Sequence, residues 1–346
     1  MKKIIKKIFD QNCPPILIAE ISANHNGSFK NAKKLILTAK KNGADIVKLQ
    51  TYEPKNMTID ISKKDFMVKH GLWKNYKLWD LYKMAQTPLS WQKKLFDYAK
   101  KINIPCFSTP YDDEGVELLE KINTPIYKVS SFEMSDIPLI KKICKTGKPL
   151  IISTGLAQLK DIEKIYKILK SHNCKNFVFL YCVSSYPAKI EDFNLNNIKI
   201  LKKKFKCEVG FSDHSLDNSV SMMAVSMGAR VIEKHIALEN QKKGLDIEFS
   251  IKGKEIKKFK NDLLKAWKLI GREKFFRSKN ELINKKFQRS IYVINKINKG
   301  DKFTKNNIKR IRPGFSLSAE RWDYILGKKS NKNFKIGSRI NIKDIK

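Results

Sequence analysis

Long apolar runs are absent from this sequence of 346 residues: none approaches the roughly 20 residues that a transmembrane helix requires. The opening stretch, MKKIIKKIFDQNCPP, is basic but lacks the apolar core of a signal peptide. The six cysteines are scattered without any CxxC pair, which argues against a zinc ribbon and favours small buried thiols in a reducing compartment. These absences predict a cytoplasmic protein with no membrane partner.

Acidic residues are scarce, since 34 Asp and Glu stand against 71 Lys and Arg and leave a net charge of +37. A nucleic-acid-binding protein gathers such charge on one face. Here the lysines are spread along the whole chain, and no RNP, zinc-finger or helix-turn-helix motif occurs. We therefore expect no nucleic-acid partner and attribute the charge to the lysine-rich composition of the chain. The positive field would attract an acidic small substrate.

Short β-rich segments alternate with lysine-rich helical stretches. Continuous apolar strands between helices are typical of a parallel sheet, and eight such units in about 250 residues are typical of a (β/α)8 TIM barrel. The predicted strands are residues 16–22, 46–52, 104–110, 126–131, 149–155, 177–184, 207–213 and 231–236. We predict an α/β fold whose barrel domain spans residues 1–280.

The interval at residues 53–103 is too long for an ordinary connection, and loops of this length are usually functional. It is rich in aromatic residues, namely Trp73, Tyr76, Trp79, Tyr82 and Trp91. We expect it to form a lid or rim with a small core of its own.

The pattern changes near residue 280. Residues 240–285 fit a last barrel helix and a linker, and the remainder shows short strands, KG turns and single helical turns. We predict a small β-rich C-terminal domain over residues 281–346.

Polar residues end every predicted barrel strand. They are Glu20; Lys48 and Gln50; Ser108 and Thr109; Lys128, Ser130, Ser131 and Glu133; Ser153 and Thr154; Ser184, Ser185 and Tyr186; Ser212, Asp213 and His214; and Glu233, Lys234 and His235. One such residue alone is usually a solvated rim residue or part of a turn. Eight polar ends together predict a site, because barrel enzymes place their active sites at the carboxyl ends of the strands.

The composition of these ends indicates the ligand. Two lysines and several hydroxyls suit a phosphate and a carboxylate. His214 and His235 end adjacent strands, close enough to share one divalent metal. Glu20 and Glu133 are candidate general acid or base groups.

The ordered segments IAEISANHNGS, GADIVKLQTY, FSTP, YKVSSFE, ISTG, SSYP, VGFSDHS and GARVIEKH resemble the sialic acid synthase family. The resemblance covers residues 16–346, and residues 287–346, with IRPGFSLSAE and LGKK, look like the family's C-terminal antifreeze-like (SAF) domain. SANH, the GLW…LYKMAQTPLSW excursion and FQRSIY look most like the pseudaminic acid synthases of this family.

This resemblance implies a transferase that condenses phosphoenolpyruvate with the open-chain aldehyde of an N-acetylated sugar. The products would be a nine-carbon 2-keto sugar acid and phosphate, formed by attack of C3 and cleavage of the C–O bond. It also implies a divalent metal, Mn²⁺, Mg²⁺ or Co²⁺, and a homodimer with swapped C-terminal domains.

The family's roles fall on matching positions of this sequence. Catalytic roles fall on Glu20, Lys48, Glu133 and His235. Phosphoenolpyruvate contacts fall on Lys48, Thr109, Lys128, Ser131, Ser153, Ser184 and Ser212, and the metal on His214 and His235. Sugar contacts fall on Glu20, Gln50, Tyr186 and Asp246, and on Arg312, which the partner subunit would receive.

Two departures and several alternatives stand beside this interpretation. Ser184 occupies a position where N-acetylneuraminate synthases carry Asn, and KKGLDIEFS matches the family only loosely around Asp246. The acceptor sugar could instead be a precursor of legionaminic or N-acetylneuraminic acid. A more distant alternative is a Schiff-base aldolase with Lys48 or Lys128 as nucleophile. We assign no role to residues 1–12 from the sequence.

Overall fold

The computed structural model describes residues 2–10, 12–271 and 273–346. The chain divides into two compact units, Met1–Gly271 and Arg272–Lys346. No helix within the described ranges is both long enough and apolar enough to traverse a bilayer.

Eight parallel strands close the first unit into a barrel. They are β1 (Ile16–Glu20), β2 (Ile46–Thr51), β3 (Cys106–Pro110), β4 (Tyr127–Val129), β5 (Leu150–Ser153), β6 (Phe177–Cys182), β7 (Glu208–Asp213) and β8 (Val231–Ala237). Each pairs with the next, and β8 pairs with β1 so that Glu20 lies beside His235. A two-residue strand, β9 (Ile251–Lys252), extends the sheet beyond β8. The predicted (β/α)8 barrel is confirmed.

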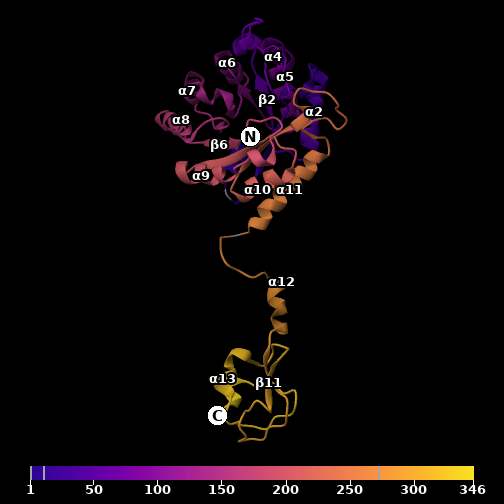
Figure 1. Ribbon diagram of the computed structural model, residues 1–346, viewed down its shortest axis with the longest axis vertical. Helices are drawn as coiled ribbons and strands as arrows, with labels where there is room; N and C mark the ends of the chain where they lie inside the picture. Colours follow the sequence, from indigo (N-terminus) through magenta and orange to yellow (C-terminus); the bar gives the residue numbers. More distant parts are fainter. Residues whose placement is uncertain (1, 11, 272) are drawn as a thin grey trace. The chain divides into compact units, whose positions relative to one another are not determined.

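Helices surround these strands in Figure 1. The barrel helices are α2 (Phe29–Lys41), α5 (Leu89–Lys101), α6 (Asp113–Lys121), α7 (Ile137–Lys145), α8 (Leu159–Ser171), α9 (Asn196–Phe205), α10 (Asn218–Ser226) and α11 (Glu255–Ile270). Several begin at a side chain that accepts a backbone N–H of the first turn, as Ser28, Asp112 and Asp136 do.

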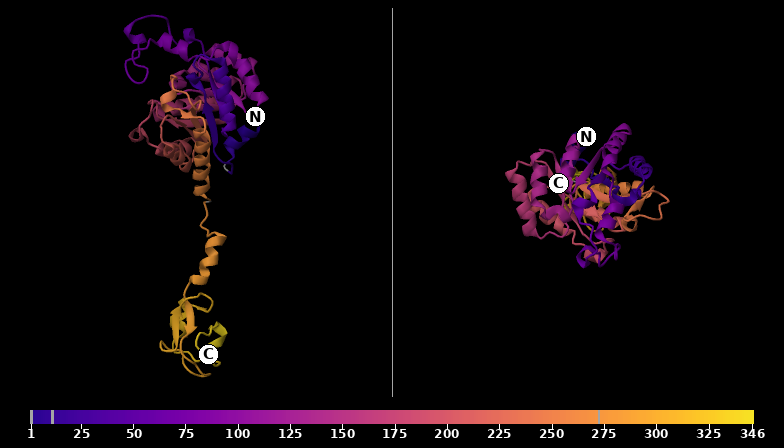
Figure 2. Two further views of the ribbon diagram at one scale, coloured as in Figure 1. Left: turned by 90° about the vertical axis from the view of Figure 1, so that its right-hand side faces the viewer. Right: turned by 90° about the horizontal axis from the view of Figure 1, so that it is seen from above.

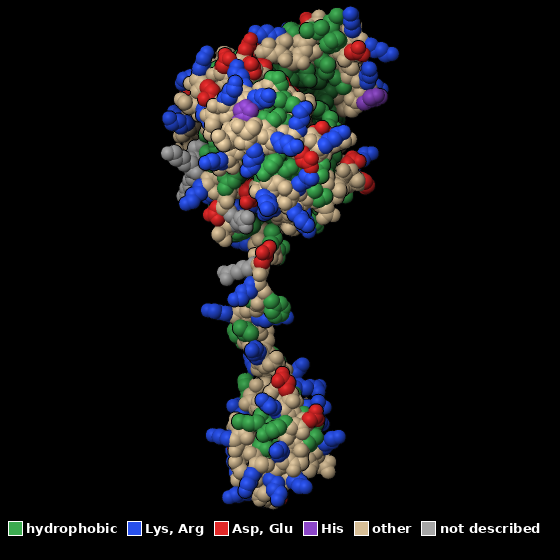
Figure 3. Space-filling model, turned by 90° about the vertical axis from the view of Figure 1, so that its left-hand side faces the viewer, with side chains coloured by type: hydrophobic (Ala, Val, Ile, Leu, Met, Phe, Trp, Pro, Cys, Tyr) green, Lys and Arg blue, Asp and Glu red, His purple; other side chains and the backbone are tan. Residues whose placement is uncertain are grey.

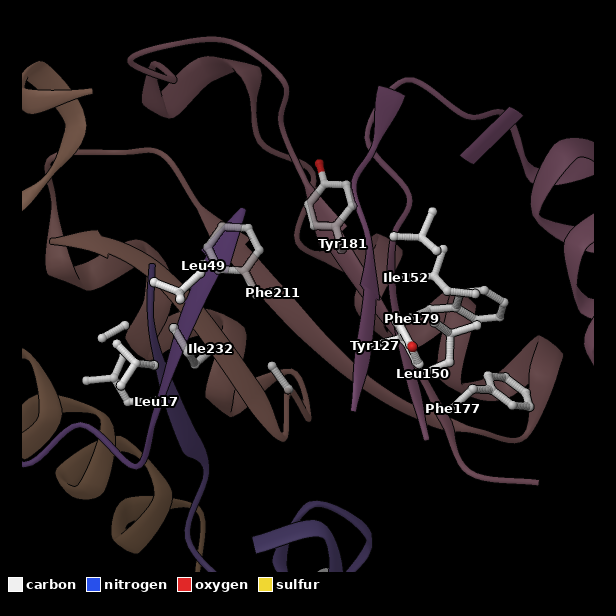
Figure 4. Packing of buried hydrophobic residues seen from close by; sticks show 14 of the residues in the cluster. Leu17, Leu49, Tyr127, Leu150, Ile152, Phe177, Phe179, Tyr181, Phe211 and Ile232 are labelled. Atoms are coloured by element: carbon white, nitrogen blue, oxygen red, sulfur yellow. The ribbon is translucent and has the colours of Figure 1, made fainter. Parts of the chain in front are cut away.

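Alternation along each strand separates two apolar layers. One face of the strands packs against the helices, and Figure 4 shows part of this layer, including Leu17, Leu49 and Phe211. The other face fills the barrel interior near the amino ends of the strands, with Ile16, Ile18, Ile46, Phe107, Ile126, Ile151, Val178, Leu180 and Val231. The interior near the carboxyl ends is therefore left to polar side chains.

The N-terminal helix α1 (Lys2–Phe9) packs on this inner layer. Ile4, Ile5 and Phe9 pack against it, and Ile8 belongs to it. Arg230 donates hydrogen bonds to backbone carbonyls of the same segment, including that of Cys13 at 2.6 Å. The basic N-terminal stretch, which has no role assigned from the sequence, thus covers the amino-terminal end of the barrel.

The excursion after β2 contains α3 (Pro54–Met57), a 3-10 turn at Lys64–Phe66 and α4 (Leu78–Ala85), and Figure 2 shows it at the edge of the barrel. The expectation of a separate core is wrong for the described residues, because α4 has no buried side chain and no apolar cluster is built from this segment. Trp91 belongs to α5 and packs edge-on against His25 instead.

The second unit has a three-stranded antiparallel sheet of its own. Its strands β10 (Ser290–Val293), β11 (Ile308–Ile311) and β12 (Leu317–Ser318) lie in the order β11-β10-β12. Its helices are α12 (Lys279–Leu282) and α13 (Trp322–Ile325), and its core includes Ile291, Phe303 and Phe334.

Basic side chains are scattered over the surface. On the face drawn in Figure 3, blue Lys and Arg side chains cover both units, with red carboxylates among them on the barrel. They form no single stripe on this face.

Candidate active site

A cavity of about 350 Å³ opens at the carboxyl ends of the barrel strands. Eleven predicted site residues line it: Lys48, Gln50, Lys128, Ser131, Glu133, Ser153, Tyr186, Ser212, His214, His235 and Asp246. Those on strands reach it because side chains two apart on a strand share a face, and parallel strands end at the same edge. The volume suits a small-molecule ligand.

Lys48, Lys128 and Glu233 form the floor of the cavity, and Glu20 lies behind Lys48. Glu233 lies between the lysines, with Oε1 3.4 Å from Nζ of Lys128 and Oε2 3.8 Å from Nζ of Lys48. It also accepts a hydrogen bond of 3.0 Å from Ser212 Oγ. Lys48 forms a second ion pair with Glu20, and none of these charged side chains is more than 4% exposed.

Burial and pairing shift the pKa values of this cluster. Burial lowers the pKa of Lys128 although Glu233 opposes it. For Lys48 burial acts in the same sense, but the charges of Glu20 and Glu233 outweigh it, so its pKa is raised. Burial raises the pKa of Glu20 to about 7 against the pull of Lys48. One cavity lysine is thus held firmly charged, while the other holds its proton less tightly.

The two histidines lie side by side, with ring centroids 5.6 Å apart. His214 Nδ1 is 3.0 Å from the carbonyl oxygen of Val183, so Nδ1 carries the proton and Nε2 has the free lone pair. His235 Nδ1 is buried without a hydrogen-bond partner, 3.6 Å from Oδ2 of Asp246. Burial lowers the pKa of His214 to about 4 and that of His235 well below its usual value.

Neutral imidazoles with free lone pairs fit a divalent metal, and a backbone carbonyl that orients one ring is typical of a metal-binding histidine. Among the residues that the structure describes, no group of three or more His, Cys, Asp or Glu side chains could hold an ion. The pair therefore suits a metal that takes its remaining oxygen ligands from water or substrate.

Glu133 stands apart from the lysine cluster. It accepts a hydrogen bond from Ser130 Oγ, and burial raises its pKa to about 7. A carboxyl group on the cavity wall that titrates near neutrality can donate or accept a proton at physiological pH.

The loops after β4, β5 and β6 meet closely beside the cavity. Ser131 Oγ lies 2.9 Å from Ser184 Oγ. Gly155 has φ +24°, and a Cβ added there would lie 2.2 Å from Cβ of Ser131 and 2.7 Å from Ser184 Oγ. Only glycine leaves these two serines in place.

Comparison with known proteins identifies the fold's relatives. Residues 35–275 match the profile of the NeuB family. A pseudaminic acid synthase of Campylobacter jejuni is 42% identical over 335 residues, which make up 97% of this chain and 96% of that protein. The chain belongs to the NeuB family. The sialic acid synthase family predicted from the motifs is confirmed, and the chain is an enzyme of that type.

Other relatives differ in the sugar that their names give. An N,N'-diacetyllegionaminic acid synthase of Campylobacter jejuni is 37% identical, covering 92% of this chain and 97% of that protein. The crystal structure of the N-acetylneuraminic acid synthetase from Leptospira borgpetersenii, in complex with citrate, matches with a TM-score of 0.71 and 30% identity. This match covers 79% of the present chain and 90% of the other.

Four predicted site residues of this NeuB-family chain are not on the cavity wall. Glu20 and Thr109 lie behind it and contact Lys48, with 3.2 Å between Thr109 Oγ1 and Lys48 Nζ. Ser184 contacts Ser131 instead. Arg312 belongs to the second unit, where its side chain is exposed, so its contact with a barrel stays a prediction.

Glu233 lines the cavity, although we predicted no role for it from the sequence. It lies two residues before His235 on β8 and therefore shares its face. That spacing was visible in the sequence, but contact with both lysines depends on how β2, β4 and β8 stand around the barrel. Ser22 was also missed: its N–H donates to Glu20 Oε1 at 2.8 Å, and its Oγ accepts from Gln50 at 3.0 Å.

Proposed function

We propose that this enzyme is a pseudaminic acid synthase. It condenses phosphoenolpyruvate with a 2,4-diacetamido-2,4,6-trideoxyhexose to give a nine-carbon 2-keto sugar acid and phosphate. The observation that carries the proposal is the pair of buried lysines, Lys48 and Lys128, in one cavity with the neutral imidazoles of His214 and His235. Lysine side chains suit a substrate that carries two anionic groups, and neutral imidazoles suit a metal ion.

Phosphoenolpyruvate binds on the floor of the cavity. Lys48 and Lys128 neutralise its carboxylate and phosphate, and the hydroxyls of Ser131 and Ser153 donate hydrogen bonds to its oxygens. Ser212, whose hydroxyl donates to Glu233 in this structure, turns that hydroxyl toward the substrate when it binds. Ser153 Oγ is buried and makes no hydrogen bond within the described residues, so it is available to a ligand. Behind this wall, Thr109 supports Lys48 and Ser184 supports Ser131.

The reaction forms one C–C bond and breaks one C–O bond. The C2=C3 electron pair of phosphoenolpyruvate attacks the aldehyde carbon, and the aldehyde oxygen takes up a proton. Water adds to C2, and the tetrahedral intermediate expels phosphate with the electrons of the C–O bond. The two protons of the water end on the new hydroxyl and on the phosphate.

Glu133 is the acid that protonates the aldehyde oxygen, because it lies on the cavity wall with a pKa of about 7. Glu20 acts through Lys48, which it holds in place. Gln50, Tyr186 and Asp246 contact the sugar.

His214 and His235 would hold Mn²⁺, Mg²⁺ or Co²⁺. Bound there, the ion supplies Lewis acidity toward the aldehyde oxygen. Their unprotonated state at neutral pH is what a metal requires.

We also propose that residues 281–346 are an antifreeze-like (SAF) domain, and that the enzyme is a homodimer in which Arg312 enters the partner's cavity. A guanidinium suits the carbonyl and hydroxyl oxygens of an N-acetyl sugar because its donors are arranged in a rigid fork. A cytoplasmic location accords with the six cysteines, all within the described residues and all free.

The test is phosphate release from phosphoenolpyruvate with three acceptors: the pseudaminic, legionaminic and N-acetylneuraminic acid precursors. The pseudaminic acid precursor should give the highest kcat/KM. A higher value with either other sugar would assign the enzyme to that product. Borohydride trapping separates the Schiff-base aldolase, since only that enzyme would form a covalent adduct on Lys48 or Lys128.

A further inference from the structure

The wall of the cavity formed by residues 52–85 contrasts with the charged floor. It carries no charged side chain and no Ser, Thr, Asn or Gln. Its members, which we call the apolar wall, are Tyr52, Met57, Val68, Trp73, Leu78, Leu81, Tyr82 and Ala85. Phe132, 59% exposed, extends this surface on the loop after β4.

Most polar atoms of the apolar wall already have partners. Trp73 Nε1 donates to the carbonyl of Leu245 at 2.9 Å, and the Tyr52 hydroxyl donates to the carbonyl of Tyr82 at 3.3 Å. The Trp73 ring packs against Tyr186, with centroids 5.6 Å apart. The hydrogen bonds and packing fix the aromatic side chains and leave few donors for a hydroxyl of a ligand.

Helix α4 presents one face to the cavity. Leu78, Leu81, Tyr82 and Ala85 are spaced i, i+3, i+4 and i+7, which places them on one side of the helix. None of them is fully buried, although a helix that packs on a protein core buries this face. The face is therefore left for a molecule that enters the cavity.

We infer that the apolar wall is the subsite for the far end of the acceptor sugar, and that it selects a methyl over a hydroxymethyl group at C6. The inference rests on the proposed function, in which the anionic substrate occupies the charged floor and leaves the wall to the sugar. A methyl group gains from burial against Leu78 and Leu81. A hydroxyl group that faces these two leucine side chains would lose water without gaining a hydrogen bond from them.

The test compares kcat/KM for the 2,4-diacetamido-2,4,6-trideoxyhexose with that for its 6-hydroxy congener. An apolar pocket rejects an added hydroxyl by about a hundredfold, so the wild-type ratio should be near that value. Leu81→Asn, and independently Leu78→Asn, supplies a donor and an acceptor and should reduce the ratio to about tenfold or less. Met84→Asn is the matched control on the exposed side of α4 and should keep the wild-type ratio.

The KM for phosphoenolpyruvate and the far-ultraviolet circular dichroism should not change in the variants. A leucine variant that meets these two conditions is folded and binds phosphoenolpyruvate normally, so its sugar ratio alone tests the inference. An active wild-type enzyme with a ratio near one, or a leucine variant that keeps the full ratio, would overturn the inference alone. Absence of phosphate release with both sugars would overturn the proposed function, and this inference with it.

Discussion

The carboxylate of Asp213 lies 3.3 Å from Nζ of Lys234, and neither residue lines the cavity. Asp213 also accepts hydrogen bonds from Ser215 and Ser221, and Lys234 donates to the carbonyl of Ser215. Each residue immediately precedes one of the two cavity histidines. The pair therefore joins β7 to β8 where both carry their imidazoles.

Replacing one partner leaves a buried charge unpaired. Lys234→Met should lower the free energy of unfolding by about 3–5 kcal/mol, measured by urea denaturation. The double variant Asp213→Asn, Lys234→Met should recover more than half of this loss, because no unpaired charge remains. If the double variant instead loses the sum of the free energies lost in the two single variants, the ion pair is not what stabilises this junction.

Lys128 supplies one of the two charges for phosphoenolpyruvate. Lys128→Met should raise the KM for phosphoenolpyruvate by about ten- to a hundredfold with the sugar saturating, since one charge-assisted contact is worth about 1.5–3 kcal/mol. Lys93→Met, an exposed lysine on α5, is the control and should leave KM unchanged. A normal KM in Lys128→Met would place the substrate elsewhere.

Glu133 should govern the pH dependence of the reaction. Its raised pKa keeps it protonated up to about pH 7. As a general acid it is lost above that pH, so kcat/KM should fall about tenfold per pH unit on the alkaline side. Glu133→Gln should lower the rate about 10²- to 10⁴-fold and remove this limb. A variant with an unaltered pH profile would transfer the role to another group.

His214→Ala should abolish Mn²⁺ binding, measured by equilibrium dialysis or electron paramagnetic resonance, because one of two protein ligands is lost. His172→Ala, at the end of α8, provides the comparison and should bind Mn²⁺ like the wild type. Turnover should stop in chelator and return with added metal. Full activity after chelation and dialysis would exclude a metal role for the two imidazoles.

Mixed dimers test whether Arg312 acts across subunits. His235→Ala and Arg312→Ala should each be inactive as homodimers. Refolded together, they should regain part of the activity, because one cavity of a mixed dimer would carry both lesions and the other neither. Mixed dimers that form without recovery would place the arginine in its own subunit.

The barrel and most of the cavity wall were predictable because the pattern of strands and the polar residues within them both indicated a site at the carboxyl ends of a parallel barrel. Lys48, Lys128 and His235 lie on the apolar strands β2, β4 and β8, and a closed parallel sheet brings these strands around one cavity. The sequence does not show whether a polar side chain reaches the surface of the cavity or lies behind it. Glu20 and Lys48 are register partners on β1 and β2, yet Glu20 lies behind the wall and Lys48 lies on it, which depends on side-chain packing across strands.

The expectation that residues 53–103 have a core of their own was wrong for a related reason. Leu78, Leu81 and Trp73 have the spacing and apolarity of core residues, and a helix turned toward a cavity has the same pattern as one turned toward a core. Only the observed surroundings separate the two. Conversely, the amphipathic pattern of α1 was present in the sequence, but its partner, the inner layer of the barrel, was not evident without the closed sheet.

The proposed reaction expels phosphate by cleaving the C–O bond of phosphoenolpyruvate, and an isotope label shows directly which bond breaks. Phosphoenolpyruvate labelled with ¹⁸O in the bridging position is turned over with the sugar and Mn²⁺, and the released phosphate is analysed by ³¹P NMR. We expect the label to appear in the phosphate. Unlabelled phosphate would mean that the P–O bond breaks instead, which would contradict the proposed reaction.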